Sequence, residues 1–263
     1  GWARARRPLG RAARLLAVCA LVVAAIVLGK AGERMVRRSA LFSVRTVRVE
    51  GNHHLTAERI RALSGIALGQ SVFEVSPAEA QARLEQSPWV AQADVERRLP
   101  NTFVVQLTEH RPVLLLSLDQ PYLVADDGMV FKQAGVDDPV DLPVLTGVDR
   151  ARFTAERAYR TSVIADALGL LGDYRGSGLS AAEPVDEVHV ESTGGLSIYI
   201  GSDAMFVRLG RPPFLTKLRR LRTLLQHFAS SDRRPAYVYL DSPSRPDRAT
   251  VYLRPLPVRS ASR

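Results

Sequence analysis

The chain has 263 residues, of which 46% are hydrophobic, and a formal net charge of +9. This length allows one large domain or two modest ones; ordinary glycine and proline contents with a single cysteine exclude collagen-like, disulfide-rich and wholly disordered chains. The charge is unevenly spread: residues 1–40 hold nine basic and one acidic side chain, residues 41–207 hold 14 and 23, and residues 208–263 hold 13 and 3. The net charge of +9 describes none of these three segments, since two are basic and the middle one is acidic. It therefore does not indicate a nucleic-acid binder.

An apolar run near the N-terminus predicts a transmembrane helix that contacts lipid. The uncharged stretch LLAVCALVVAAIVLG lies between Arg14 and Lys30. Its helix would cover roughly 22 Å, but residues 12–32 would cover roughly 31 Å, about the thickness of the hydrocarbon core, if Arg14 and Lys30 reach the headgroups. We expect the helix at 15–32 with these two residues flanking the membrane. A cleaved signal peptide is the alternative, disfavoured because no small-x-small cleavage site follows the run.

The charges around this run predict its orientation. Residues 1–14 contain five arginines and no acid, which indicates a basic tail on the cytoplasmic side. The rest of the chain would then lie in the periplasm, with the protein crossing the inner membrane once. Cys19 lies within the apolar run and has no second cysteine to pair with, so we expect it to act as a small hydrophobic side chain.

Residues 41–111 predict a compact domain in which a strand is followed by two helices and two strands. The expected elements are, in chain order, 42–50, 56–65, 76–88, 92–98 and 103–108. The strands show apolar side chains at every second position. The second helix begins with Ser76, Pro77 and Glu79, the pattern of a capping box with proline in the first turn. Both helices can cover one face of the small sheet.

Residues 112–256 predict a second, β-rich domain, and residues 257–263 a C-terminal tail. Apolar and alternating runs predict strands at 113–118, 122–124, 129–131, 185–191, 196–200, 205–209, 236–240 and 249–253. Two amphipathic helices are expected at 154–171 and 214–228. The fold class is therefore α+β: an N-terminal transmembrane helix, a β-α-α-β-β domain, and a mostly antiparallel β domain with flanking helices.

Several segments resemble a known family. The runs FSVRTVRVEGN, residues 42–52, and WVAQADVERRLPNTFVVQLTEHRPV, residues 89–113, resemble a POTRA (polypeptide-transport-associated) domain. The Trp-Val opening, the Arg-Leu-Pro-Asn-Thr hairpin and the Glu-His-Arg-Pro exit together are similar to the FtsQ/DivIB cell-division family. Residues 123–147 are similar to the LVDxxGxVF … LPxLxG progression of FtsQ-like proteins, with the small departure that Ala125 precedes Asp126. The resemblance covers roughly residues 12–255.

The sequence offers no converging set of reactive side chains, so we expect no catalytic, cofactor-binding or metal-binding residues and no small-molecule substrate. A nucleophile elbow, a Walker loop and a His-Glu-x-x-His motif are all missing from it. His53 and His54 are adjacent and would point apart on a regular element, whereas a metal-binding pair shares a face. The pairs Asp126-Asp127 and Asp137-Asp138 could suggest acid–base carboxylates, but beside glycine and proline they fit turns better.

The basic helix at 214–228 admits two interpretations. Packing on a sheet through its Leu/Phe stripe, with a solvated cationic face, is favoured. Contact with an acidic partner, a phosphate backbone or a lipid headgroup is the alternative. Nucleic acid is disfavoured further, because the expected topology places the helix outside the cytoplasm.

The C-terminal strand region is the candidate partner-binding site. A strand at a sheet edge presents unpaired N–H and C=O groups to which a partner segment could add. Apolar or aromatic side chains near this edge are Tyr237, Tyr239, Val251, Tyr252 and Leu253. The residues alone leave core packing and partner contact equally open. The resemblance implies partner contact, because FtsQ-like proteins use this region to bind FtsB within a complex with FtsL.

The resemblance implies a non-catalytic scaffold of the divisome at the septum. Its partners would be FtsB-like and FtsL-like membrane division proteins, with other divisome components as further candidates, and it would coordinate septal cell-wall synthesis. A POTRA-bearing secretion or outer-membrane assembly component is the main alternative, but that class should continue into a long series of barrel strands. A secreted enzyme would need a deep pocket with convergent polar groups.

Overall fold

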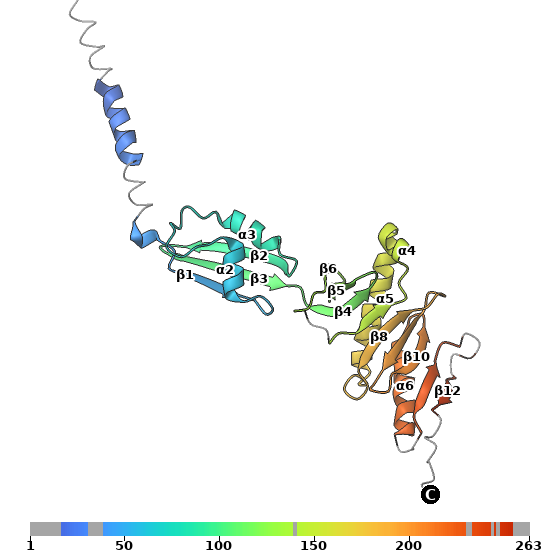
Figure 1. The fold of residues 1–263 in the computed structure, drawn as a ribbon. Helices are drawn as coiled ribbons and strands as arrows, with labels where there is room; N and C mark the ends of the chain where they lie inside the picture. Colours follow the sequence, from blue (N-terminus) through green and yellow to red (C-terminus); the bar gives the residue numbers. More distant parts are fainter. Residues whose placement is uncertain are drawn as a thin grey trace, which may run out of the picture. The chain divides into compact units, whose positions relative to one another are not determined.

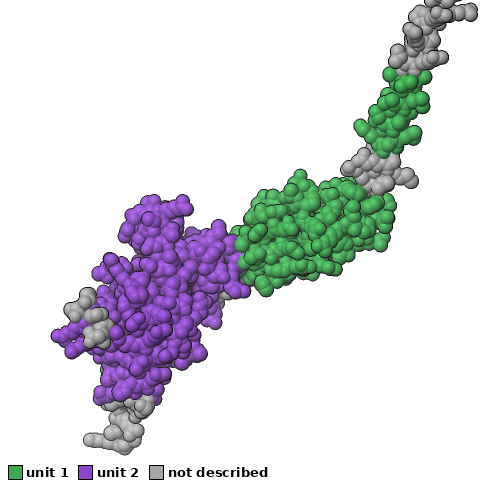
Figure 2. All heavy atoms as spheres, turned by 180° about the vertical axis from the view of Figure 1, so that it is seen from behind, with its two compact units in different colours: residues 1–109 green, residues 110–263 purple. Residues whose placement is uncertain are grey.

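The computed structural model describes residues 17–30, 39–138, 141–229, 233–242, 245 and 248–254. The chain divides after Glu109 into two compact units, coloured separately in Figure 2. Each unit has its own buried hydrophobic core, and each is described by itself.

Residues 17–30 form a helix in which every side chain is exposed. Its apolar side chains include Leu21 and Leu28, which are 70% and 72% exposed. None of the helices that the structure describes combines the length and the apolar character needed to cross a membrane. The transmembrane helix expected over 15–32 is thus not found among the described residues. Both ends of that range and the tail at 1–14, with Arg14, lie outside them, and Lys30 is the last residue of the described helix.

The first unit contains the expected succession of strand, two helices and two strands (Figure 1). After a short 3-10 helix, η1 (Ala40–Phe42), its elements are β1 (Thr46–Glu50), α2 (Ala57–Ser64), α3 (Pro77–Glu85), β2 (Val90–Arg98) and β3 (Thr102–Glu109). Strand β3 lies at the centre of the sheet, parallel to β1 and antiparallel to β2. The predicted β-α-α-β-β order is confirmed.

Local capping explains where the two helices of this unit begin. The Thr56 side chain accepts a hydrogen bond from the N–H of Arg59 at 3.2 Å, and the Ser76 side chain accepts one from the N–H of Glu79 at 3.4 Å. Such caps satisfy N–H groups that have no partner inside the helix. Helix α2 ends at Ser64 and is capped by Gly65, whose φ of 72° is the left-handed conformation that glycine adopts most easily.

The first strand is shorter than the alternating sequence predicts. Strand β1 begins at Thr46, whereas the expected range began at residue 42. The backbone of Val44 donates to Gln70 O, and the backbone of Val72 donates to Phe42 O, each at 2.8 Å. Residues 42–44 therefore pair with the loop before α3 instead of with β3.

The second unit is built on one nine-stranded sheet. Its elements are β4 (Pro112–Ser117), β5 (Pro121–Ala125), β6 (Val130–Gln133), β7 (Val144–Thr146), α4 (Arg150–Ala155), α5 (Arg157–Gly176), β8 (Val185–Val190), β9 (Leu196–Ile200), β10 (Met205–Gly210), α6 (Leu215–Phe228), β11 (Pro235–Tyr239) and β12 (Thr250–Leu253). The strand order is β12-β11-β10-β9-β8-β7-β4-β5-β6. Among the described strands five of the eight pairings are antiparallel, which confirms a mostly antiparallel sheet.

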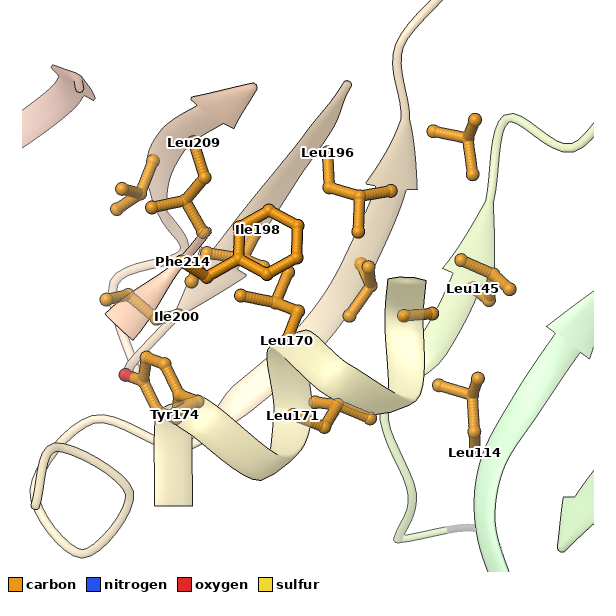
Figure 3. Close-up of a cluster of buried hydrophobic side chains, with 14 of the residues drawn as sticks. Leu114, Leu145, Leu170, Leu171, Tyr174, Leu196, Ile198, Ile200, Leu209 and Phe214 are labelled. Carbon is orange, nitrogen blue, oxygen red and sulfur yellow. The ribbon is translucent and has the colours of Figure 1, made fainter. Parts of the chain in front are cut away.

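Helices α5 and α6 pack on one face of this sheet and bury its core. Figure 3 shows Leu170 and Tyr174 of α5 beside Ile198 and Ile200 on β9. Helix α6 contributes Leu218 and Leu221, both fully buried. None of the described helices lies on the opposite face of the strands β9 to β12, and this face holds the candidate site.

The helix expected at 154–171 is two helices in the structure. Glu156 is extended, with φ −107° and ψ 101°, and it separates α4 from α5. Helix α5 then continues to Gly176, beyond the glycines at 169 and 172. Glycine costs a helix about 1 kcal/mol, but Leu170 and Tyr174 are buried in this stretch, and their packing outweighs that cost.

Candidate functional site: the C-terminal edge of the large sheet

Strand β12 forms one end of the nine-stranded sheet. It pairs antiparallel with β11, with Tyr237 opposite Tyr252 and Val238 opposite Val251. Within the part of the chain that the structure describes, no strand pairs with its other side. The backbone groups on that side are therefore available for a further strand.

The two faces of this edge differ in chemistry because side chains alternate along a strand. On the face that carries the helices, Val238 is fully buried, Val251 packs against the same core and Leu253 is half-buried. On the other face, Tyr237 and Tyr252 are 51% and 58% exposed. A segment added to β12 would meet an apolar core edge on one side and tyrosines on the other.

The tyrosine side of the edge is part of a continuous aromatic row across four strands. The ring centroids of Tyr199 and Phe206 are 5.2 Å apart, and those of Phe206 lie 6.0 Å from Tyr237 and 6.1 Å from Tyr239. Tyr239 continues the row to Tyr252 at 5.9 Å. Aromatic pairs at these distances hold each other in place, and rigid tyrosines are typical of protein interfaces.

Beyond the aromatic row, the same sheet face becomes polar. On β7 and β8 the Thr146 hydroxyl donates to the Glu187 carboxylate, and His189 Nδ1 lies 2.8 Å from Thr146 Oγ1. Burial, followed by the charge of Glu187, raises the pKa of Tyr199. Its hydroxyl therefore remains a proton donor throughout the ordinary pH range.

Arginines surround the β12 edge. Arg234 lies 3.7 Å from Glu183 and 3.6 Å from Asp203, and the Arg254 side chain donates to the backbone oxygen of Asp203. Arg245 and Arg248 are exposed in the connection before β12. This cationic border favours a partner segment that carries acidic side chains.

Two hollows of the second unit are lined by residues other than those of the aromatic row. One of about 460 Å³ lies between α5 and β6, and one of about 410 Å³ lies at the start of α6 beside Arg211 and Lys217. The Lys217 ammonium donates to the backbone oxygens of Leu209 and Arg211, and burial lowers the pKa of Lys217. Across the described ranges, no three His, Cys, Asp or Glu side chains are placed to hold a metal ion.

The structure divides the five predicted site residues between the two faces of the edge. Tyr237, Tyr239 and Tyr252 lie on the open face, whereas Val251 and Leu253 lie on the helix face. Sequence reasoning missed Tyr199 and Phe206, which complete the aromatic row. In LSIYI and MFVRLG each is an aromatic residue in a strand, but the sequence does not place these two strands beside β11.

Other residues that the sequence singled out have local structural contacts. His54 stacks on Trp89 with ring centroids 3.5 Å apart, and Asp127 accepts a hydrogen bond from the N–H of Met129 at 2.8 Å. Asp138 accepts from the N–H of Gly135 and pairs with Lys132. These contacts fit the expected turn roles of the aspartates.

The basic helix α6 packs through its apolar stripe, as favoured from its sequence. Phe214, Leu218 and Leu221 are buried beneath it. Arg222 donates from Nη1 to Ser177 O at 2.9 Å, and so joins α6 to the end of α5. At least part of its cationic face therefore has a structural role.

Comparison with known families gives matches in both units. Residues 42–110 match the POTRA domain, FtsQ-type, and residues 116–241 match the C-terminal domain described as Cell division protein FtsQ/DivIB. The first match covers the small sheet; the second covers the large sheet as far as β11, and β12 lies beyond its last residue.

Curated proteins with related sequences carry the same description. A Cell division protein FtsQ from Anaeromyxobacter sp. (strain K) is 35% identical over 249 residues, which is 94% of this chain and 84% of that protein. One from Syntrophotalea carbinolica is 33% identical over 73% of this chain and 68% of its own length. A Cell division protein DivIB from Geobacillus kaustophilus is 38% identical over 42% of this chain and 43% of its own length.

Proposed function

The chain belongs to the FtsQ/DivIB family of cell division proteins, and on this premise we propose that its β12 edge binds a strand of a partner protein in the divisome. The protein acts as a non-catalytic scaffold. The observation that carries the proposal is the combination at β12: an outer side without a partner strand in the described residues, next to the two most exposed tyrosines of the sheet.

FtsB-like and FtsL-like membrane division proteins are the proposed partners. An FtsB-like segment adds to β12 through main-chain hydrogen bonds, with side-chain contacts providing selectivity. Tyr237, Tyr239, Val251, Tyr252 and Leu253 are the proposed contacts. Arg245 and Arg248 at the border favour acidic side chains in that segment.

Our domain assignment places a POTRA domain at 41–111 and the β domain at 112–256. The separate compact cores of the two units support it. In this arrangement the β domain supplies the partner edge, and binding at that edge coordinates septal cell-wall synthesis.

A single membrane-spanning helix over 15–32 anchors the scaffold at the septum, with residues 1–14 in the cytoplasm and both domains in the periplasm. Support comes from the uncharged run between Arg14 and Lys30 and from the exposure of every side chain at 17–30. An apolar helix without a protein surface to cover its side chains is stable when lipid covers them. Release of the chain from membranes by alkaline carbonate would contradict this anchor.

The partner proposal is tested by replacing Tyr252→Pro in the full chain in detergent. Proline removes a backbone N–H from β12, so we expect affinity for the exported segment of the FtsB-like protein to fall at least about tenfold, which is about 1.4 kcal/mol. Binding is measured by calorimetry. The matched control is Gln133→Pro on β6, at the opposite end of the sheet, which should leave this affinity unchanged.

A second variant keeps the backbone intact. Tyr237→Ser with Tyr252→Ser shortens the exposed aromatic side chains without removing an N–H group, and it should also weaken binding. Unchanged affinity in a Tyr252→Pro chain whose circular dichroism is native would contradict strand addition at β12.

A further inference from the structure

The large sheet has a second edge, far from β12. Strand β6 pairs with β5 through Val124 opposite Val130 and Leu123 opposite Lys132. No described strand lies on the other side of β6. Both β6 and β12 contain four residues, so the sheet ends in two short edges of equal length (Figure 1).

A groove lies between α5 and the turn that leads into β6. This hollow of about 460 Å³ has apolar lining from Met129, Val130, Ile164, Ala165 and Leu168 and polar lining from Asp127, Arg160 and Thr161. Met129 is 54% exposed. Groove and strand lie together, so a segment that adds to β6 can place alternate side chains against α5.

The two ends of the sheet carry opposite charge. Residues 117–141 contain six aspartates and one lysine; Lys132 pairs with Asp138 and Arg150 pairs with Asp119, which leaves four aspartates outside these two ion pairs. Residues 233–254 contain five arginines and two aspartates. Opposite fields on the two ends attract one another and oppose contact between like ends.

We propose that the sheet associates head to tail, with β12 of one molecule docking beside β6 of a second copy. Val251 and Leu253 are half-buried on the helix face of β12. When β12 of one copy pairs with β6 of the next, these two side chains lie beyond Val130 on the helix face and contact the groove. Arg245 and Arg248, which both precede β12, then approach the acidic residues at one end of β6 in the next copy. Asp126 precedes β6 and Asp137 follows it, and all four side chains are exposed.

This contact is heterologous, because different surfaces of the two copies meet, and a dimer still has one free end of each kind. Molecules anchored in the same membrane could extend such a row. The inference goes beyond the proposed partner binding but uses the same strand, β12. A partner segment on β12 would therefore end the row.

Two charge-reversed variants test the proposal in the full chain in detergent, by sedimentation velocity. The acidic-end variant is Asp126→Lys with Asp137→Lys, and the basic-end variant is Arg245→Glu with Arg248→Glu. The unmodified chain should gain mass with concentration and lose it with added salt. Each variant alone should associate at least about tenfold more weakly.

An equimolar mixture of the two variants provides the decisive measurement. Each variant retains one intact end, and the two reversed ends are also complementary in charge, so the mixture should regain the association that each variant alone has lost. The proposal is overturned if the unmodified chain stays monomeric at its highest soluble concentration, if a variant alone associates like the unmodified chain, or if the mixture remains monomeric. If the circular dichroism of a double variant is not native, the corresponding single variant, Asp137→Lys or Arg248→Glu, is measured in its place.

Binding of the FtsB-like segment is measured on the same samples. The acidic-end variant retains β12 and should bind the segment with unchanged affinity. Loss of self-association with intact partner binding therefore distinguishes this contact from the proposed function. Partner binding that fails while the mixture still dimerises would reject the proposed function alone.

Discussion

Tyr174 shows how one buried hydroxyl ties helix α5 to the segment that leads into β8. Its side chain is 1% exposed, and its hydroxyl donates to Glu183 O at 2.6 Å. Burial, with a smaller effect from the Glu183 charge, raises the pKa of Tyr174 well above its ordinary value. Above about pH 10 the unfolded chain loses this proton while the folded chain keeps it. The contribution of Tyr174 to the free energy of unfolding is therefore fully present below about pH 10 and is lost as the pH rises further.

We expect Tyr174→Phe to lower the free energy of unfolding by about 1 kcal/mol at neutral pH, because one hydrogen bond is lost. The variant should also lose less stability than the unmodified chain above about pH 10. Urea unfolding between about pH 7 and pH 11 measures both effects. The lowered pKa of Lys217 has the opposite effect, because it makes stability rise with pH. Both chains contain Lys217, so this effect cancels when the variant is compared with the unmodified chain. Parallel stability profiles would contradict a contribution from Tyr174, and Tyr252→Phe is the exposed control.

Helix α6 shows at the scale of an element how an apolar stripe fixes a helix on a sheet. Leu218 and Leu221 are completely buried one turn apart, whereas Gln226 is exposed. The helix has no side-chain cap at its N-terminus. Its position therefore depends mainly on packing.

We expect Leu218→Ala to destabilise the second unit by about 2–5 kcal/mol, because it removes buried methyl groups and leaves a cavity. Gln226→Ala on the same helix should change stability by less than about 0.5 kcal/mol. Denaturant midpoints of the two variants measure the difference. Equal midpoints would mean that α6 does not stabilise the sheet by packing.

The described residues of the two units form two hydrophobic cores that share no residue. Phe103 and Leu84 lie in the first, and Leu170 and Ile198 lie in the second. Each core is closed by helices and strands of its own unit, as in domains that fold separately.

Core substitutions should therefore act on one unit at a time. Phe103→Ala should destabilise the first unit by about 3–5 kcal/mol, and Leu170→Ala should destabilise the second by about 2–5 kcal/mol. Hydrogen exchange followed by mass spectrometry reports the two units separately. Loss of protection in both units after either substitution would show that they unfold as one.

Local features of the sequence predicted the elements well. The capping groups at Thr56 and Ser76 and the left-handed Gly65 fixed helix ends within a few residues, because these contacts involve near neighbours in the chain. Where a distant segment intervened, prediction failed. Residues 42–44 alternate like a strand, but the loop at 69–72 pairs with them.

For the candidate site, sequence patterns were enough to predict that the last strands alternate apolar and aromatic side chains and that basic residues outnumber acidic ones in the C-terminal segment. Only the fold shows that β10 lies between β9 and β11, which connects Tyr199 through Phe206 to Tyr237. A period of two residues specifies that side chains alternate, but not which face is covered by a helix or which strand is the neighbour. Those choices depend on packing among segments far apart in the chain, here the placement of α5 and α6 on one face of the sheet.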